Sequence, residues 1–107
     1  MVVLHVYIAL RWRARLRGVL GRSPEILDAG LLIAPCRAVH TCFMRRALDV
    51  VFLDDKDRVV GCVSGLAPWR FAWKAGTRRV LELRAGRIHE LGIGPGARIE
   101  TVVLNEL

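Results

Sequence analysis

Uncharged polar side chains are scarce in this chain of 107 residues, which contains no glutamine, a single asparagine (Asn105) and two serines, Ser23 and Ser64. Hydrolytic and acyl-transfer sites use such side chains as nucleophiles and as donors to a developing oxyanion. An oxyanion hole in this chain would have to be built from backbone amides alone. The composition therefore weighs against an enzyme of that class.

Three motifs with a defined mechanism are also missing. There is no G-x-x-x-x-G-K-[ST] loop for nucleotide phosphates, no G-x-G-x-x-G between a strand and a helix, and no H-E-x-x-H pair for zinc. Gly92, Gly94 and Gly96 alternate near the end of the chain, but they have the spacing of turn glycines. These absences argue against nucleotide hydrolysis, dinucleotide redox chemistry and zinc-dependent proteolysis.

The three cysteines, Cys36, Cys42 and Cys62, include no C-x-x-C pair. They indicate neither a disulfide framework nor a zinc ribbon, and they fit a reducing compartment. The apolar segment Met1–Leu10 is too short to cross a bilayer, and its positive charges follow the apolar run, the reverse of a secretory signal. We therefore expect a cytoplasmic protein without a membrane span.

Positive charge exceeds negative charge, because Lys+Arg number 17 and Asp+Glu number 10, which gives a net charge of +7. The excess is arginine, since Lys56 and Lys74 are the only lysines. Such a field attracts polyanions but does not determine a fold. Hydrophobic residues make up 53% of the chain, enough for one packed domain over residues 1–107 and too little chain for a second core.

Short apolar runs separated by turn residues predict a mainly β (α+β) fold. Helical periodicity is confined to Arg11–Leu20, with Trp12, Leu16, Val19 and Leu20 as its apolar stripe, and to two short segments, Pro24–Asp28 and Ala85–Leu91. We expect a single compact antiparallel sheet, or a partly closed barrel, of about six to seven short strands. The predicted strands are Val2–Ala9, Leu31–Ala34, Val39–Met44, Val50–Leu53, Val59–Ser64, Arg79–Leu83 and Ile99–Leu104, with a hairpin turn at Asp54–Asp57.

Five stretches of the chain form a recognisable set of motifs: RLRGVLGR (Arg15–Arg22), GLLIAPC (Gly30–Cys36), VHTCFMRRALDVVFLD (Val39–Asp54), Pro68-Trp69-Arg70 and VLELRAG (Val80–Gly86). Taken together they resemble the DUF192 family, also called UPF0127, small bacterial and archaeal domains of unknown function. The resemblance runs from about Trp12 to Ile99 with order and spacing kept, so its motifs are specific as a set. It implies a compact, largely antiparallel β domain with short helices and no established reaction.

The chain departs from that family pattern at three loops. Arg46-Ala47 precedes Leu48-Asp49 where members commonly have a proline, Asp57 stands where a glycine usually tightens the hairpin, and Ala97 stands where an acidic residue is frequent. A site built on those loops would be altered in this chain.

The leading functional hypothesis is a non-catalytic accessory module that binds a small molecule or a protein partner. Trp and Arg are the residue types that anchor interfaces and stack on planar or sugar-like ligands, and they gather in the turn-rich segment Pro68–Trp73. The predicted binding residues, which also match recurrent family positions, are His40, Met44, Asp49, Trp69 and Arg70.

Metal binding and catalysis are weaker hypotheses for the same region than ligand or partner binding. Cys36, His40 and Met44 are soft ligands, but on an extended chain residues four apart lie ~13 Å from each other, too far to share one ion. We therefore predict no metal or other cofactor. An undetected enzyme would use Cys36 and His40 with Asp49, whereas a buried structural role for Asp49 would pair it with Arg45, Arg46 or Arg70.

The basic helical segment gives a second alternative, an anionic-surface or nucleic-acid binder. Residues 11–22 contain five arginines and no acid, a pattern that tracks phosphates only if the arginines line one groove. The strands show no aromatic and basic interleaving of an RNA-binding sheet, so nucleic acid is the weaker partner. Either a monomer or a homodimer fits the sequence. The arginines are Arg11, Arg13, Arg15, Arg17 and Arg22.

Overall fold

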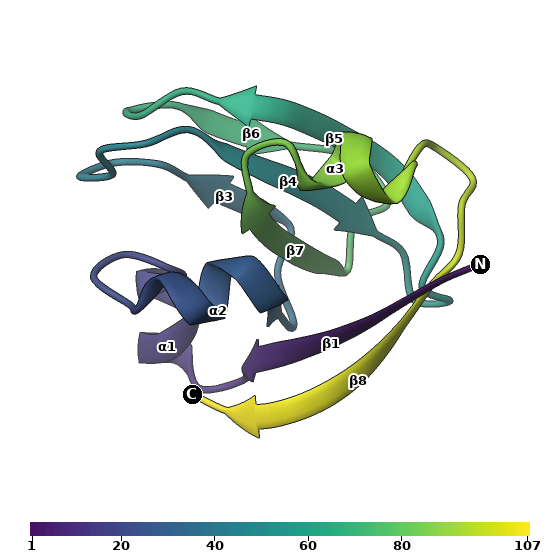
Figure 1. Cartoon of the computed structure of the whole chain (residues 1–107), viewed down its shortest axis with the longest axis horizontal. Helices are drawn as coiled ribbons and strands as arrows, with labels where there is room; N and C mark the ends of the chain where they lie inside the picture. Colours follow the sequence, from purple (N-terminus) through teal and green to yellow (C-terminus); the bar gives the residue numbers. More distant parts are fainter.

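The computed structural model describes residues 1–107 as eight strands and three short helices (Figure 1). The mainly β, α+β class predicted from the sequence is confirmed. The elements in chain order are β1 (Val2–Ala9), α1 (Trp12–Arg17), α2 (Pro24–Ala29), β2 (Leu31–Ile33), β3 (Ala38–His40), β4 (Leu48–Leu53), β5 (Val59–Leu66), β6 (Phe71–Trp73), β7 (Arg79–Arg84), α3 (Arg87–Leu91) and β8 (Ile99–Glu106).

Six strands form one mixed sheet in the order β5-β4-β7-β2-β1-β8, and β3 pairs with β6 in a separate two-stranded sheet. β1 lies parallel to both β2 and β8, whereas the other pairs are antiparallel. The parallel β1–β2 pair follows from the helical crossover through α1 and α2, a connection that returns the chain in the same direction. The sheet is not closed into a barrel, although Arg58 and Arg98 form an isolated bridge between the chain segments beside β5 and β8.

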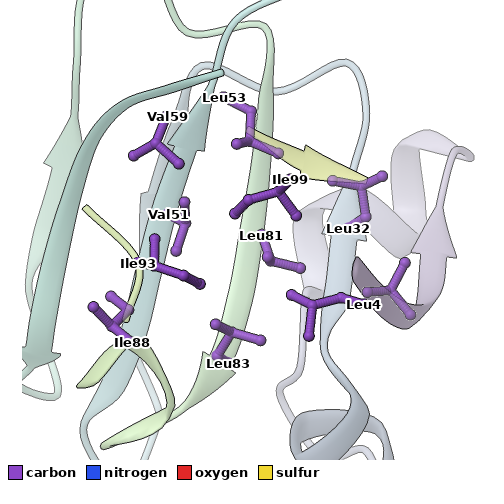
Figure 2. Packing of buried hydrophobic residues seen from close by; sticks show 11 residues of the cluster. Leu4, Leu32, Val51, Leu53, Val59, Leu81, Leu83, Ile88, Ile93 and Ile99 are labelled. Carbon is purple, nitrogen blue, oxygen red and sulfur yellow. The ribbon is translucent and has the colours of Figure 1, made fainter. Parts of the chain in front are cut away.

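The inner strand β4, which lies between β5 and β7, is buried along its whole length, because both faces of the sheet are covered there. Its side chains alternate between two cores. Val51 and Leu53 face a cluster with Leu81, Leu83 and Ile88, shown in Figure 2, and α3 lies over this face. The alternate side chains Leu48, Val50 and Phe52 face a second cluster, which also contains Val19 and Val39. The candidate site lies on this second side.

The predicted helix over Arg11–Leu20 is wrong in length and in its buried stripe. α1 ends at Arg17, and Gly18 follows with φ +54° and ψ −131°, a conformation that breaks the helix. The chain then turns Val19 into the second core, while Trp12 and Leu16 stay 60% and 65% exposed. No residue of α1 is therefore fully buried, and two large apolar side chains of the helix stay at the surface.

The segment predicted as one strand, Val39–Met44, is also different. β3 ends at His40, and residues 41–47 form a loop before β4. β6, which the sequence did not predict, supplies the partner of β3 with His40 opposite Phe71. This short second sheet carries the loops that border the candidate site.

Candidate functional site

A pocket of about 370 Å³ opens between α1, β3 and the loop after β3. We call it the α1–β3 pocket. Most of its lining is apolar, and its volume falls in the range of small-molecule sites. Its lining residues are Trp12, Arg15, Leu16, Arg17, Gly18, Val19, Leu20, Ile33, Cys36, Ala38, Val39, His40, Cys42, Met44, Leu48 and Glu82.

Glu82 is the only acidic residue that lines the α1–β3 pocket. Strand alternation places it there: its neighbours Leu81 and Leu83 face the first core, so the side chain of Glu82 projects to the opposite side. The residue is 3% exposed, and its Oε1 accepts a hydrogen bond of 3.2 Å from the backbone amide of Val19. The carboxyl group is thus fixed in a pocket whose lining is mostly apolar.

Burial raises the pKa of Glu82 from 4.5 to about 7, because the charged form loses its hydration. The Val19 hydrogen bond and the positive charge of Arg22 oppose this shift without cancelling it. A group with such a pKa exchanges a proton near neutral pH. Perturbed acids in a cavity are characteristic of functional sites, although structural networks also produce them.

The arginines of residues 11–22 do not line one groove. Arg15 Nη1 donates to the carbonyl of Pro35 at 2.9 Å, and Arg22 Nε donates to the carbonyl of Gly18 at 2.6 Å. Arg17 Nε binds the carbonyl of Leu20 at 2.8 Å, which holds the turn after α1. Arg13 lies over the ring of Trp12, and Arg11 lies 4.0 Å from Glu106. The hydrogen bonds of Arg15, Arg17 and Arg22 to backbone carbonyls stabilise the chain around the pocket. Anion binding by the five arginines of residues 11–22 stays a prediction.

Thr41 joins the two loops beside the pocket. Its buried hydroxyl donates to the carbonyl of Ala67 at 2.6 Å and accepts from the amide of Arg70 at 2.9 Å. Its backbone carbonyl accepts from the amides of Met44 at 3.1 Å and Trp69 at 3.0 Å. These hydrogen bonds hold the loop after β3 and the loop before β6 together.

Phe43 and Trp69 are the aromatic tips of those two loops. Their ring centroids lie 4.8 Å apart, both side chains are exposed, and both residues have positive φ, 67° and 62°. A bulky residue in the left-handed region costs on the order of 1–3 kcal/mol, and such strain concentrates at binding and catalytic sites. Phe71 on β6 adds a further exposed ring, 6.2 Å from that of His40.

Four of the five predicted binding residues come together here. His40 and Met44 line the pocket, and Trp69 and Arg70 lie in the loop that Thr41 ties to it. Asp49 does not join them. It is fully buried, and its carboxylate accepts hydrogen bonds from the amides of Gly65 (2.8 Å), Gly86 (3.0 Å) and Ile88 (2.9 Å).

Asp49 is therefore part of the scaffold, and its partners are not the arginines expected from the sequence. Three backbone amides supply the compensation that a buried carboxylate needs. The amides come from the end of β5 and from the start of α3, so Asp49 fixes both elements against β4. Arg45, Arg46 and Arg70 remain exposed instead.

Cys36, His40 and Asp49 form no hydrogen bonds with each other. The thiol of Cys36 donates to the carbonyl of Ala38, and burial raises its pKa, the opposite of thiolate activation. His40 Nδ1 accepts a hydrogen bond of 3.1 Å from the amide of Cys42, so the neutral ring carries its proton on Nε2. No three His, Cys, Asp or Glu side chains gather where they could hold a metal ion.

Comparison with known proteins agrees with the family resemblance of the motifs. Residues 2–101 match the sequence profile of DUF192, a family described as uncharacterised ACR. This chain belongs to the DUF192 family. A second DUF192/UPF0127 sequence, the UPF0127 protein PF1050 of Pyrococcus furiosus, is 33% identical over a match that covers 91% of this chain and 86% of that protein. A UPF0127 protein of Thermococcus sibiricus is 32% identical over a match that covers 94% of this chain and 68% of the relative.

The DUF192 fold also has a counterpart among solved structures. A protein of unknown function from Novosphingobium aromaticivorans superimposes with a TM-score of 0.72 at 24% identity, over 83% of this chain and 69% of the other. At that identity the likeness concerns the fold. No helix of this DUF192 chain has both the length and the apolar character needed to cross a membrane.

One departure from the DUF192 pattern has a local compensation. Asp57 replaces the usual hairpin glycine and has φ 63°, a conformation that Asp tolerates better than most residues. Its carboxylate forms an ion pair with Arg79 on the neighbouring β7. The hairpin is thus retained without glycine.

Two residues that shape this DUF192 site, Glu82 and Thr41, were missed by the sequence analysis. A signal for Glu82 was present: an acid between Leu81 and Leu83 in an apolar run is costly unless it faces a cavity or a partner. No comparable signal marked Thr41, because its partners Ala67 and Arg70 lie far along the chain.

Proposed function

We propose that this domain is a non-catalytic binding module whose α1–β3 pocket receives a small organic ligand with an apolar body and a hydrogen-bond-donating head group. The observation that supports the proposal is the buried carboxyl of Glu82 in a pocket that is otherwise mostly apolar. The apolar walls would take the body of the ligand, and Glu82 would accept the donor.

The bordering aromatic residues support the same function. Phe43 lies between Cys42 and Met44, which both line the pocket, and Phe43 packs on Trp69. An aromatic pair held at the surface in a strained backbone conformation is costly unless it contacts something. We assign Trp69, Phe43 and Arg70 to the outer part of the binding surface and His40 to its inner wall.

Three benzyl probes of equal size test this proposal: benzylamine, benzyl alcohol and benzoate. Amide chemical shifts of the whole chain are followed by NMR during titration. We expect benzylamine to bind most tightly, with saturable shifts at Gly18, Val19 and the loop after β3, because Glu82 accepts its ammonium protons. Benzoate is expected to bind least tightly, because its charge repels that of Glu82.

Two variants separate pocket binding from surface adhesion. Glu82→Gln is expected to remove the preference for benzylamine over benzyl alcohol. Leu16→Ala removes an apolar wall and is expected to weaken the binding of all three probes, whereas Leu104→Ala removes a leucine of β8 that is also exposed and should not change binding. Absence of saturable shifts for every probe, or equal losses in the Leu16 and Leu104 variants, would overturn the proposal.

A further inference from the structure

A second cavity, of about 440 Å³, lies at the end of the β3–β6 sheet away from Trp69. We call it the β6–β7 cleft. The pairing of Ala38 with Trp73 and the hydrogen bond from the amide of Cys36 to the carbonyl of Arg78 bring its two sides together. The lining residues are Arg37, Ala38, Trp73, Lys74, Ala75, Gly76, Thr77 and Arg78.

Three cations and no acid line the β6–β7 cleft: Arg37, Lys74 and Arg78. Their side chains make no ion pair and no hydrogen bond within the protein. This distinguishes them from the next arginines along the chain, since Arg79 pairs with Asp57 and Arg84 pairs with Asp28 and Glu90. The two arginines of β7 thus have acidic partners, whereas the three cations that line the cleft have none.

Thr77 provides a second, independent observation. The residue is 3% exposed, it lines the cleft, and its hydroxyl Oγ1 is buried without a hydrogen-bond partner. An unmade hydrogen bond of this kind costs about 1–3 kcal/mol, and buried polar groups are nearly always satisfied. The charged side chains around the cleft are donors only and cannot accept the hydroxyl proton, so an acceptor bound in the cleft would supply the partner that this proton lacks.

We propose that the β6–β7 cleft binds a phosphate group, with the guanidinium groups of Arg37 and Arg78, the ammonium group of Lys74 and the hydroxyl of Thr77 as donors to its oxygens. Guanidinium and ammonium donors match phosphate oxygens in charge and in geometry. This site is distinct from the α1–β3 pocket and from the arginines of residues 11–22.

Trp73 extends the site beyond the phosphate. Its side chain is 72% exposed on the wall of the cleft, where its indole face is free to stack on a planar group. The cleft is also larger than a phosphate group alone requires. A small phosphomonoester with an aromatic ring therefore fits the site better than inorganic phosphate does.

Titration with inorganic phosphate, ribose 5-phosphate and adenosine monophosphate tests the proposal and separates these sources of phosphate. Calorimetry gives the affinities, and amide shifts at Arg37, Gly76 and Thr77 locate the site. All three probes are expected to bind there, with adenosine monophosphate the tightest. Trp73→Phe is expected to lower the affinity for adenosine monophosphate several-fold and to leave that for ribose 5-phosphate unchanged.

Variants of the donors complete the test. Thr77→Val keeps the shape of the side chain and removes the hydroxyl. Lys74→Gln removes a charge from an exposed side chain, so this variant is expected to fold normally even if Thr77→Val does not. Each is expected to weaken phosphate binding roughly tenfold. Arg45→Gln is the matched control, because it removes the same charge from an exposed loop outside the cleft.

Equal losses in Arg45→Gln and Lys74→Gln would overturn the proposal, because the binding would then reflect net charge alone. It would also be overturned if no probe produced saturable shifts at the cleft, or if only a single-stranded oligonucleotide bound. Leu16→Ala leaves the cleft intact and should not change phosphate affinity, so failure of this site and failure of the α1–β3 pocket are distinguishable.

Discussion

Gly18 lies so close to Glu82 that a Cβ atom built on the glycine would stand 2.7 Å from the carboxylate oxygen Oε1. The same glycine ends α1 with a positive φ, and the residue after it donates its amide to that oxygen. The end of α1 and the position of the Glu82 carboxylate therefore depend on each other. The motif RLRGVLGR, in which this glycine occurs, supplies a wall of the pocket, and the motif VLELRAG supplies the buried acid.

Gly18→Ala is expected to destabilise the protein by about 1–3 kcal/mol, because alanine is strained at φ +54° and its methyl group would displace Glu82. Urea unfolding measures the change. Gly94→Ala is the control, since Gly94 has open space at its Cβ position and no positive φ. That control should be neutral or slightly stabilising. Equal stability of the two variants would contradict the close contact.

Glu82 is expected to make stability depend on pH between 4.5 and about 7. Its pKa is higher in the folded chain than in the unfolded chain, so the native state holds the proton more tightly. Below pH 4.5 both states are protonated and there is no penalty. As pH rises toward 7, the unfolded state ionises freely while the buried carboxyl does not, and stability falls by up to about 3 kcal/mol.

The variant Glu82→Gln isolates this contribution from those of the other carboxyl groups. Wild type and variant are unfolded in urea across the pH range, and the difference between their unfolding free energies is plotted. The difference should change in favour of the variant between pH 4.5 and 7 and stay flat outside that window. A difference that is flat throughout would show that Glu82 has an ordinary pKa.

Local patterns predicted the regular parts of the fold. The apolar runs gave β1, β4, β5, β7 and β8, and the acidic cluster after β4 gave the hairpin turn. In that turn Asp54 Oδ1 accepts hydrogen bonds from the amides of Lys56 and Arg58, which is the chemistry that makes such clusters turn signals. Four of the predicted binding residues, His40, Met44, Trp69 and Arg70, lie in or beside the α1–β3 pocket, and their role in binding stays a prediction.

Long-range pairing could not be predicted in the same way. β3 and β6 have three residues each, and their pairing depends on Thr41, whose hydroxyl partners lie 26 and 29 residues away. The predicted arginine partners of Asp49 were wrong for a related reason. Backbone amides leave no signal in a sequence, whereas the side-chain donors near Asp49 along the chain are arginines. The helix periodicity likewise failed at Gly18, where a tertiary contact ends α1.

Asp49→Ala is expected to lower stability by about 3 kcal/mol or more rather than to affect binding directly. The change leaves the amides of Gly65, Gly86 and Ile88 without their acceptor. Urea unfolding and hydrogen exchange at these three amides measure the effect. Asp55→Ala, an exposed acid in the hairpin, should be close to neutral. A normally stable Asp49→Ala protein would return Asp49 to the list of binding candidates.

Thr41→Val is expected to loosen the outer part of the binding surface while the sheet stays folded. The variant keeps the shape of the side chain but removes the hydroxyl that joins Ala67 and Arg70, at a cost of about 2 kcal/mol. With that link broken, the loop that carries Trp69 is tied to Thr41 through backbone hydrogen bonds alone, so we expect the stacking of Trp69 on Phe43 to loosen and the indole to gain contact with water. Fluorescence in a Trp12→Phe, Trp73→Phe background reports Trp69 alone and should shift to longer wavelength. Thr101→Val on β8 is the control for the loss of a threonine hydroxyl. If the emission of the two variants is the same, the loops hold their positions without the Thr41 hydroxyl, and the backbone hydrogen bonds of residue 41 together with the stacking of Trp69 on Phe43 maintain the strain at Trp69.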